Sequence, residues 1–207
     1  MSAELGLRER KKQRTRQQIA DAAWRLFAER GFDQVPISQI AAEAEVSEAT
    51  VFNYFETKED LVFHRMEAFE DELLDAIRDR APGESIVQAF GGFVLKPRGF
   101  LARDDPAASE GMRTVARVMN SPTLQARERE ILERYTEALA GLIAQERGAD
   151  AADVEPWVAA NALIGLHRAL IAFTHRQALA AVDNRRIARN LRAQGKRALA
   201  ALEHGLG

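Results

Sequence analysis

A short run of residues near position 50 carries side chains suited to reading hydrogen-bond patterns on another molecule. Thr50 and Asn53 both donate and accept hydrogen bonds, which is the chemistry that the edges of nucleic-acid bases require. Ala49 is small enough to permit close approach, and the ring of Phe52 suits contact with a thymine methyl or the sugar backbone. Two aromatic residues within three positions, Phe52 and Tyr54, are often simple core filling, and a three-helix unit can also be a protein-docking module, so these residue types alone leave the interpretation open.

A basic cluster lies upstream of this run. Between Met1 and Ala20 six Lys and Arg residues stand against two Glu residues, a local charge of +4 in a chain whose net charge is −2. The remainder therefore sums to −6. A basic edge on an acidic body suits phosphate binding, although a solvated helix start accounts for it equally well.

The polar run needs a helix to present it, and its surroundings predict a helix-turn-helix. A first long helix is expected from Arg8 to Glu29, ended by Gly31. A short helix follows with Pro36 in its first turn, then a tight turn at Glu45–Val46, and then a second short helix from Ser47, its N-cap, to Phe55. The residues expected on the packed face are Ile40, Ala44, Val46, Val51 and Phe55. The opposite face is then free to enter a major groove.

Helical periodicity also dominates the rest of the chain. Thr57 and Asp60 form a capping box for a fourth helix, which carries an apolar stripe from Val62 to Ile77 and ends at Pro82–Gly83. Further helices are expected over 84–95, 106–119, 122–147, 154–181 and 183–203, and Lys96 to Asp105 is expected to be an exposed loop. The predicted fold class is all-α, with about nine helices.

The order of these features resembles the N-terminal DNA-binding domain of the TetR family of bacterial transcriptional repressors. The resemblance covers about fifty consecutive residues and rests on these segments: the basic residues from Arg8 to Arg16, IADAAWRLF at 19–27, Gly31-Phe32, Ile40-Ala41-x-x-Ala44-x-Val46-Ser47, TVFNYF at 50–55 and KEDL at 58–61. It implies a helix-turn-helix DNA-binding domain over residues 1–56 and a larger helical effector-binding and dimerisation domain over residues 57–207.

The resemblance also assigns roles by position. It implies phosphate contacts for Thr15, Arg16 and Lys58, and a capping role for Ser47 at the start of the recognition helix. The positions that commonly meet bases or phosphates in the family are Glu48, Ala49, Thr50, Phe52, Asn53 and Tyr54.

Four residues stand apart from that pattern. Glu45 replaces the usual Gly of the turn, so a non-glycine residue is expected in a left-handed conformation. Pro36 stands where a Ser or Thr cap is usual, and Phe52 replaces a frequent Tyr. A carboxylate repels phosphate, so Glu48 is expected either to point away or to accept from cytosine N4.

The second half of the chain gives weaker signals. The segment from Trp157 to Phe173 is apolar almost all round, and the last helix pairs a narrow apolar stripe with six Lys and Arg residues. These two helices are expected to form a four-helix bundle with those of a second subunit, unless both serve only the core of one chain. Nine residues are candidates for an effector pocket, with core packing as the alternative for each: Phe69, Phe90, Phe93, Met112, Met119, Tyr135, Trp157, Asn161 and His167. Asn161 and His167 stand out because they interrupt an apolar helix.

Other classes of protein receive little support. The sequence has no cysteine, and it predicts no membrane span, no secretory signal, no cofactor and a cytoplasmic location. His64 and Glu67 share a charged helix face without a second copy of the motif, so no metal site and no enzyme are expected. The expected function is a homodimeric, ligand-responsive regulator, a repressor released from a palindromic DNA operator by an unknown small molecule. The alternative is a helical protein-interaction adaptor whose basic arm serves a protein partner.

Overall fold

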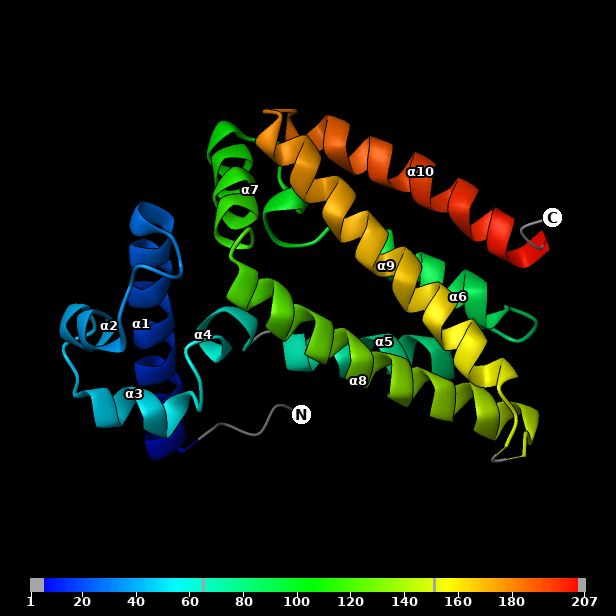
Figure 1. The fold of residues 1–207 in the computed structure, drawn as a ribbon, viewed down its shortest axis with the longest axis horizontal. Helices are drawn as coiled ribbons and strands as arrows, with labels where there is room; N and C mark the ends of the chain where they lie inside the picture. The colour runs from blue at the N-terminus through cyan, green and yellow to red at the C-terminus, as the bar shows by residue number, and fades with distance from the viewer. Residues whose placement is uncertain (1–5, 65, 151, 205–207) are drawn as a thin grey trace. The chain divides into compact units, whose positions relative to one another are not determined.

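The computed structural model describes residues 6–64, 66–150 and 152–204, which contain ten α-helices, one 3-10 helix and no strand (Figure 1). The all-α prediction is confirmed. The helices are α1 (Leu7–Arg30), α2 (Ile37–Glu43), α3 (Glu48–Tyr54), α4 (Asp60–Phe63), α5 (Met66–Arg78), α6 (Ile86–Val94), η1 (Gly99–Ala102), α7 (Pro106–Val118), α8 (Pro122–Arg147), α9 (Glu155–Leu179) and α10 (Asn184–His204).

The chain divides into two compact units. Unit 1 comprises Met1–Glu67 together with Arg117–Gln125, and unit 2 comprises Ala68–Ala116 together with Ala126–Gly207. Helix α8 therefore begins in unit 1 and continues into unit 2. The functional division at residue 57 stays a prediction.

Unit 1 is a small helical domain in which α1 packs against α2 and α4, and α2 packs against α3. Its core holds the fully buried side chains of Ile19 and Ala22 from α1, Ile40 from α2 and Val51 from α3. Gly31 ends α1 with a φ of 80°, a conformation that favours glycine. This packing fixes one face of α3 and leaves the other outside.

Unit 2 is built around α9, which packs against α6 and α10. The buried side of α9 includes Leu163, Ile164, His167 and Leu170. Helices α6 and α10 approach closely, because Gly91 of α6 lies against the side chain of Leu199 and Gly195 of α10 lies against Leu95. A Cβ atom at either glycine would overlap the opposing leucine.

The fourth helix differs from its prediction, since α4 and α5 replace one continuous helix and raise the number from nine to ten. Helix α4 ends at Phe63, and the Nδ1 atom of His64 lies 3.1 Å from the carbonyl oxygen of Leu61. A side chain that engages this carbonyl competes with the helical ladder, because the same oxygen is the acceptor of the next turn. The remaining helix boundaries lie within two residues of those expected.

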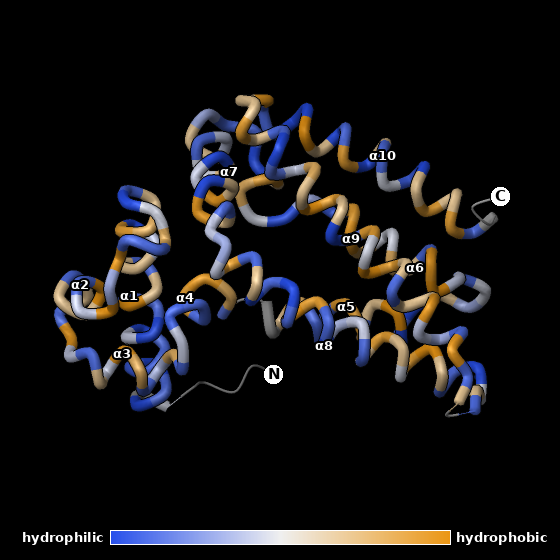
Figure 2. Tube along the Cα trace, viewed as in Figure 1, coloured by the Kyte–Doolittle hydropathy of each residue, from blue (hydrophilic) through white to orange (hydrophobic). Residues whose placement is uncertain are grey.

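Helix α9 is also long and apolar enough to cross a membrane by length and composition, with a mean hydropathy of 1.3 over its most apolar window (Figure 2). This is weak evidence, since a core helix of a water-soluble domain has the same properties. That window is 33% buried, and the buried residues of α9 are on one side of the helix and include Pro156, Ala160, Leu163 and His167.

Candidate functional site

Helix α3 is positioned by its cap and its buried face. The Oγ atom of Ser47 accepts a hydrogen bond from the backbone N–H of Thr50 at 3.1 Å, so the predicted N-cap is confirmed. The two hydroxyls of these residues lie 2.8 Å apart. Val51 and Phe55 are buried, which fixes the rotation of the helix about its axis.

The opposite face of α3 is open to solvent, as predicted. Glu48, Ala49 and Asn53 are exposed, and the side chain of Phe52 is 49% exposed although it is large and apolar. Thr50 and Tyr54 are half-buried at the rim of this face. We call these six residues, Glu48, Ala49, Thr50, Phe52, Asn53 and Tyr54, the recognition face.

The turn before α3 contains the expected left-handed residue. Glu45 has a φ of 54°, and Val46 N–H donates to the carbonyl oxygen of Ala41 at 2.9 Å. The Nε2 atom of Gln18 donates to the carbonyl oxygen of Ala44 at 2.9 Å, which ties the turn to α1. Pro36 takes the N-cap position of α2 rather than its first turn, and no side chain caps that helix.

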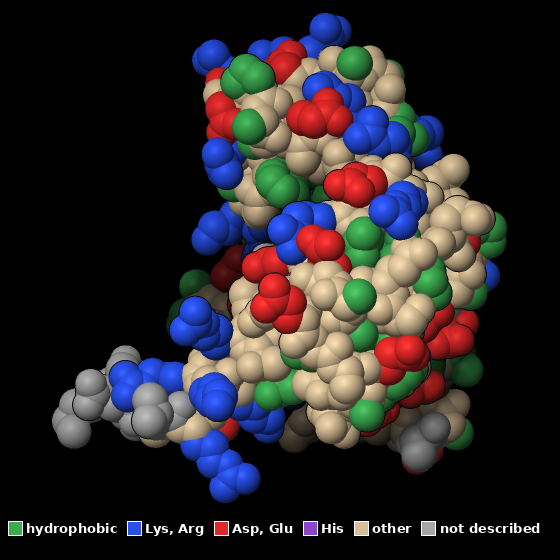
Figure 3. All heavy atoms as spheres, turned by 90° about the vertical axis from the view of Figure 1, so that its left-hand side faces the viewer, with side chains coloured by type: hydrophobic (Ala, Val, Ile, Leu, Met, Phe, Trp, Pro, Cys, Tyr) green, Lys and Arg blue, Asp and Glu red, His purple; other side chains and the backbone are tan. Residues whose placement is uncertain are grey.

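The basic residues of α1 lie on the surface of unit 1 (Figure 3). Lys and Arg side chains gather around the start of α1, near the lower edge of that view. Arg16 lies with its guanidinium carbon 5.3 Å from the centre of the Phe55 ring, at the end of α3. Thr15 donates through Oγ1 to the carbonyl oxygen of Lys11 at 3.1 Å, so its hydroxyl is partly engaged within α1.

Lys58 is held inside unit 1 more firmly than the sequence suggested. Its Nζ atom donates to the carbonyl oxygen of Phe32 at 2.6 Å and lies 4.2 Å from the centre of the Phe32 ring. Burial lowers the pKa of Lys58, and the negative charges of Asp33 and Glu59 oppose that shift. Thr57 and Asp60 exchange the predicted pair of hydrogen bonds, at 2.9 and 3.3 Å, although α4 begins only at Asp60 and Glu59 takes its N-cap position.

Side-chain hydrogen bonds join two parts of unit 1 that are far apart in the sequence, and the sequence did not predict them. Oδ1 of Asp33 accepts hydrogen bonds from Ser121 Oγ at 2.9 Å and from Thr123 Oγ1 at 3.1 Å. Ser121 lies 88 residues further along the chain, just before α8. No local pattern relates residues so far apart, and an alignment showing paired changes is the signal that finds such contacts.

Unit 2 contains an aromatic cluster built from four helices. Phe69 of α5 lies 5.1 Å from Phe93 of α6, 6.2 Å from Tyr135 of α8 and 5.2 Å from His167 of α9, between ring centres. His167 stacks on Phe69 with an angle of 17° between the ring planes. The structure thus brings together four of the nine residues predicted for an effector pocket.

Arg98 closes this cluster and was not predicted. Its guanidinium carbon lies 3.9 Å from the centre of the Phe93 ring and 5.5 Å from that of Phe69, and its Nη1 donates to the Phe93 carbonyl oxygen at 2.8 Å. Burial lowers the pKa of Arg98, opposed by Glu72. Burial, together with the positive charge of Arg98, lowers the pKa of His167 to about 4, so the imidazole is neutral at pH 7.

Comparison with known proteins decides the family. The profile of "Bacterial regulatory proteins, tetR family" matches residues 19–64. The HTH-type transcriptional regulator TcmR of Streptomyces glaucescens is 32% identical over 151 residues, which cover 72% of this chain and 67% of TcmR. The chain belongs to the TetR family. It is a helix-turn-helix transcriptional regulator.

Solved structures agree with this TetR-family fold. NalD of Pseudomonas aeruginosa, described as the secondary repressor of the MexAB-OprM multidrug efflux pump, has a TM-score of 0.59 at 20% identity, covering 90% of this chain and 97% of NalD. FadR of Bacillus subtilis, solved with stearoyl-CoA, has a TM-score of 0.52 at 20% identity, covering 90% of this chain and 96% of FadR. At these identities the likeness establishes the fold alone.

The ring contacts that define the aromatic cluster do not include the other five residues predicted for the effector pocket of this TetR-family chain. Met112 packs with Ala178 and Ile187 in a separate core cluster, and Met119 belongs to unit 1. Trp157 is 47% exposed, while Phe90 is fully buried.

Asn161 also departs from expectation. The core position considered for it is wrong, because its side chain is exposed and donates to the carbonyl oxygen of Trp157 at 2.8 Å. Among the described residues no group of three or more His, Asp or Glu side chains is placed to hold a metal ion.

Proposed function

We propose that this TetR-family regulator is a homodimeric repressor whose two recognition faces read a palindromic DNA operator, and that a small organic molecule releases it. The observation that carries the proposal is the exposed face of α3. A capped helix with a solvent-facing phenylalanine and two hydrogen-bonding side chains, Thr50 and Asn53, has the properties needed in a major groove. Burying Phe52 against DNA would also remove an apolar ring from water.

Phosphate contacts would come from the edges of the same unit. Arg16 stands at the C-terminal end of α3, and the exposed basic residues of α1 extend beyond it. Lys58 joins them only if its ammonium leaves the Phe32 carbonyl oxygen. The acidic remainder of the chain would discourage indiscriminate contact with DNA, which leaves affinity to this edge.

The proposed dimer is a four-helix bundle of α9 and α10 with their copies, in which the outer side of α9 meets the second subunit. Val158, Gly165, Ala169 and Leu179 of α9 are exposed, and the side chain of Val158 is 63% exposed. Small and apolar residues repeated at helical spacing allow a second helix to pack closely, as in a four-helix bundle. A two-fold axis would place two recognition helices about 34–36 Å apart, one turn of DNA.

The proposed effector site is the aromatic cluster and the cleft that reaches it. A cleft of about 600 Å³ is lined by Phe93 and Arg98 of this cluster and by Lys96, Glu72 and Asp79 among others. That volume is typical of small-molecule sites. The relative FadR is solved with stearoyl-CoA; for this chain we propose an organic molecule with an apolar part that displaces Arg98 from the Phe93 ring.

Helix α8 would connect the effector site to the DNA-binding unit. It begins beside Ser121, which donates to Asp33, and it carries Tyr135 of the aromatic cluster about 20 Å further along its axis. An effector that stacks among these rings would favour a position of α8 in which the recognition faces misfit the operator. Allosteric coupling of about 1–3 kcal/mol would weaken operator binding about 5–150-fold. We propose that the protein acts in the cytoplasm, without a cofactor.

A salt titration of DNA binding tests the proposal. The protein should bind a palindromic duplex taken from its genomic neighbourhood with an affinity that falls steeply as salt rises, because displaced counterions are released from phosphate. A protein-interaction adaptor has no such response. Failure to bind any neighbouring duplex at low salt would contradict the proposal. Once an operator is identified, small molecules that dissociate the protein from it are the candidate effectors.

A further inference from the structure

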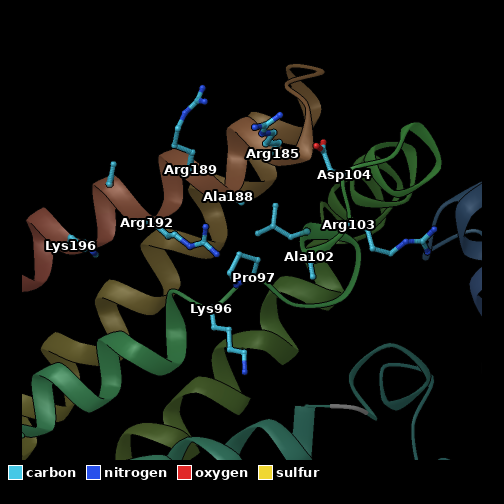
Figure 4. Close-up of a pocket in the computed structure, with 12 residues that line it drawn as sticks. Lys96, Pro97, Ala102, Arg103, Asp104, Arg185, Ala188, Arg189, Arg192 and Lys196 are labelled. Atoms are coloured by element: carbon cyan, nitrogen blue, oxygen red, sulfur yellow. The ribbon is translucent and has the colours of Figure 1, made fainter.

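A basic groove crosses unit 2 on the side of α10, apart from the recognition face and the aromatic cluster. It has a volume of about 810 Å³ and lies between α10 and the segment from Lys96 to Asp104 (Figure 4). Lys96 lines both this groove and the cleft proposed for the effector, and none of the other residues of that cleft lines the groove.

The charged residues that line this groove are mostly positive. Its lining includes Lys96, Arg103, Arg185, Arg189, Arg192 and Lys196, against one carboxylate, Asp104. Arg103 pairs with Asp105 at 3.0 Å. Across the described ranges 6–64, 66–150 and 152–204, the structure pairs none of the other five cations with a carboxylate or a hydrogen-bond acceptor.

Four of these cations form one stripe along α10. Arg185, Arg189, Arg192 and Lys196 are spaced four, three and four residues apart, so they share a helix face over about 16 Å. Figure 4 shows Arg192 extending from α10 toward Pro97, while Arg189 extends outward from the helix. Like charges at such spacing repel one another, so the stripe costs stability unless an anion neutralises it.

The floor of the groove is apolar and fixed. Pro97, Leu101, Ala188 and Ala193 contribute small apolar surfaces between the cations. Asn184, which is 1% exposed, donates through Nδ2 to the carbonyl oxygens of Phe100 at 2.8 Å and Arg103 at 3.3 Å. These bonds hold η1 and its flanks against the start of α10, so the two walls of the groove are joined at one end.

We propose that this groove binds a small molecule that carries two or more phosphate groups. Arg and Lys side chains are the usual partners of phosphate, and several cations along 16 Å or so suit an extended oligophosphate better than a single anionic group. The apolar floor suits a ring attached to the phosphates. The volume of the groove falls in the range of small-molecule sites.

The alternative occupants fit less well. A duplex is a wide rod that meets an extended surface, whereas this groove is a pocket with an apolar floor. A two-fold dimer contact centred here would place the four-cation stripe of α10 against its own copy, which like charges disfavour. A bound oligophosphate instead pairs the free cations with the negative charge that they lack.

Two double variants provide the test. R189Q/R192Q removes two cations that line the groove, and R186Q/R197Q removes two exposed cations of the same helix that do not line it. Both lower the net charge by the same amount. Adenosine triphosphate and inorganic tripolyphosphate serve as probes, with adenosine as the phosphate-free control, in calorimetric titrations of the full chain without DNA.

The wild type should bind both phosphate probes and not adenosine. R189Q/R192Q should weaken binding roughly tenfold or more, because charge-assisted hydrogen bonds are lost, and R186Q/R197Q should stay within about twofold of the wild type. The proposal is overturned if neither probe binds at about 1 mM, if adenosine binds as tightly, or if both variants weaken binding equally. It is also overturned if R189Q/R192Q loses duplex affinity instead, which would make the groove a DNA contact. Circular dichroism establishes that each variant is folded.

Discussion

Ser121 donates a hydrogen bond through Oγ to Oδ1 of Asp33 at 2.9 Å, joining the loop after α1 to the residue that precedes α8. The same Ser121 oxygen accepts from the backbone N–H of Leu124 at 3.4 Å, so it also caps α8. Thr123 Oγ1 adds a second bond to Asp33 at 3.1 Å. One carboxylate of the DNA-binding unit therefore holds the first turn of the helix that carries Tyr135 into the aromatic cluster.

Replacing Asp33 should uncouple the effector from DNA. In D33A both hydroxyl bonds are lost, while α3 and its cap are untouched. We expect operator affinity without effector to change less than about threefold and effector-induced release to weaken by about fivefold or more, since coupling of 1–3 kcal/mol is typical. Fluorescence anisotropy of labelled operator, with and without effector, measures both quantities. D21A is the control, because it removes an exposed carboxylate of α1 whose described hydrogen bond is to Gln17, and it should leave effector-induced release unchanged. Equal effector-induced release in D33A and the wild type would contradict the coupling role of Asp33.

Replacing Glu45 should stabilise the protein. Its φ of 54° strains any residue with a Cβ atom, and glycine relieves that strain at some cost in chain entropy. We expect E45G to raise the free energy of unfolding by roughly 0.5–1 kcal/mol, measured by urea denaturation. E45A keeps the Cβ atom and should give no gain. If E45A stabilises as much as E45G, strain is not the cause.

His167 should make stability depend on pH. Its folded-state pKa of about 4 lies below the ordinary 6.5, so as pH falls from 6.5 toward 4 the unfolded chain binds a proton that the folded chain excludes. The contribution of the neutral His167 to the free energy of unfolding is therefore fully present above pH 6.5. About 2 kcal/mol of that contribution should be lost at pH 5. H167F keeps a ring against Phe69 and cannot titrate. Urea denaturation at pH 7.5 and 5 should show the wild type losing about 2 kcal/mol more than H167F, and equal losses would refute the buried neutral imidazole.

Lys58 distinguishes a phosphate contact from a structural one. If its ammonium turns from the Phe32 carbonyl oxygen to a phosphate, K58A should weaken binding to every duplex and flatten the slope of log affinity against log salt by about one contact. K58R keeps the charge and should keep the slope. A loss of affinity in K58A with an unchanged slope would assign Lys58 to the packing of unit 1 alone.

Local chemistry made unit 1 predictable. The Ser47 cap and the Thr57 and Asp60 pair each involve residues within a few positions of one another. Residue type and spacing determine such features, so the sequence is sufficient to predict them. The left-handed Glu45 was expected from the resemblance to the TetR family, which usually has Gly at that position.

The features that the sequence missed depend on tertiary contacts. The segment from Lys96 to Asp105 looked like an exposed loop, yet Arg98 lies half-buried over Phe93. Asn161 and His167 both interrupt an apolar helix, and only the packing of α9 separates an exposed amide from a buried imidazole. The split between α4 and α5 leaves no Gly or Pro signal in the sequence near His64.

Selection of bound duplexes from random DNA tests the central claim most directly, that the recognition face reads sequence. The wild type should enrich a two-fold symmetric site whose half-sites are centred about 10 base pairs apart, one helical turn. N53A should enrich a site with altered preference at specific positions, because Asn53 is placed to contact base edges. No enriched site in the wild type, or an identical site in N53A with uniformly weaker binding, would contradict the account.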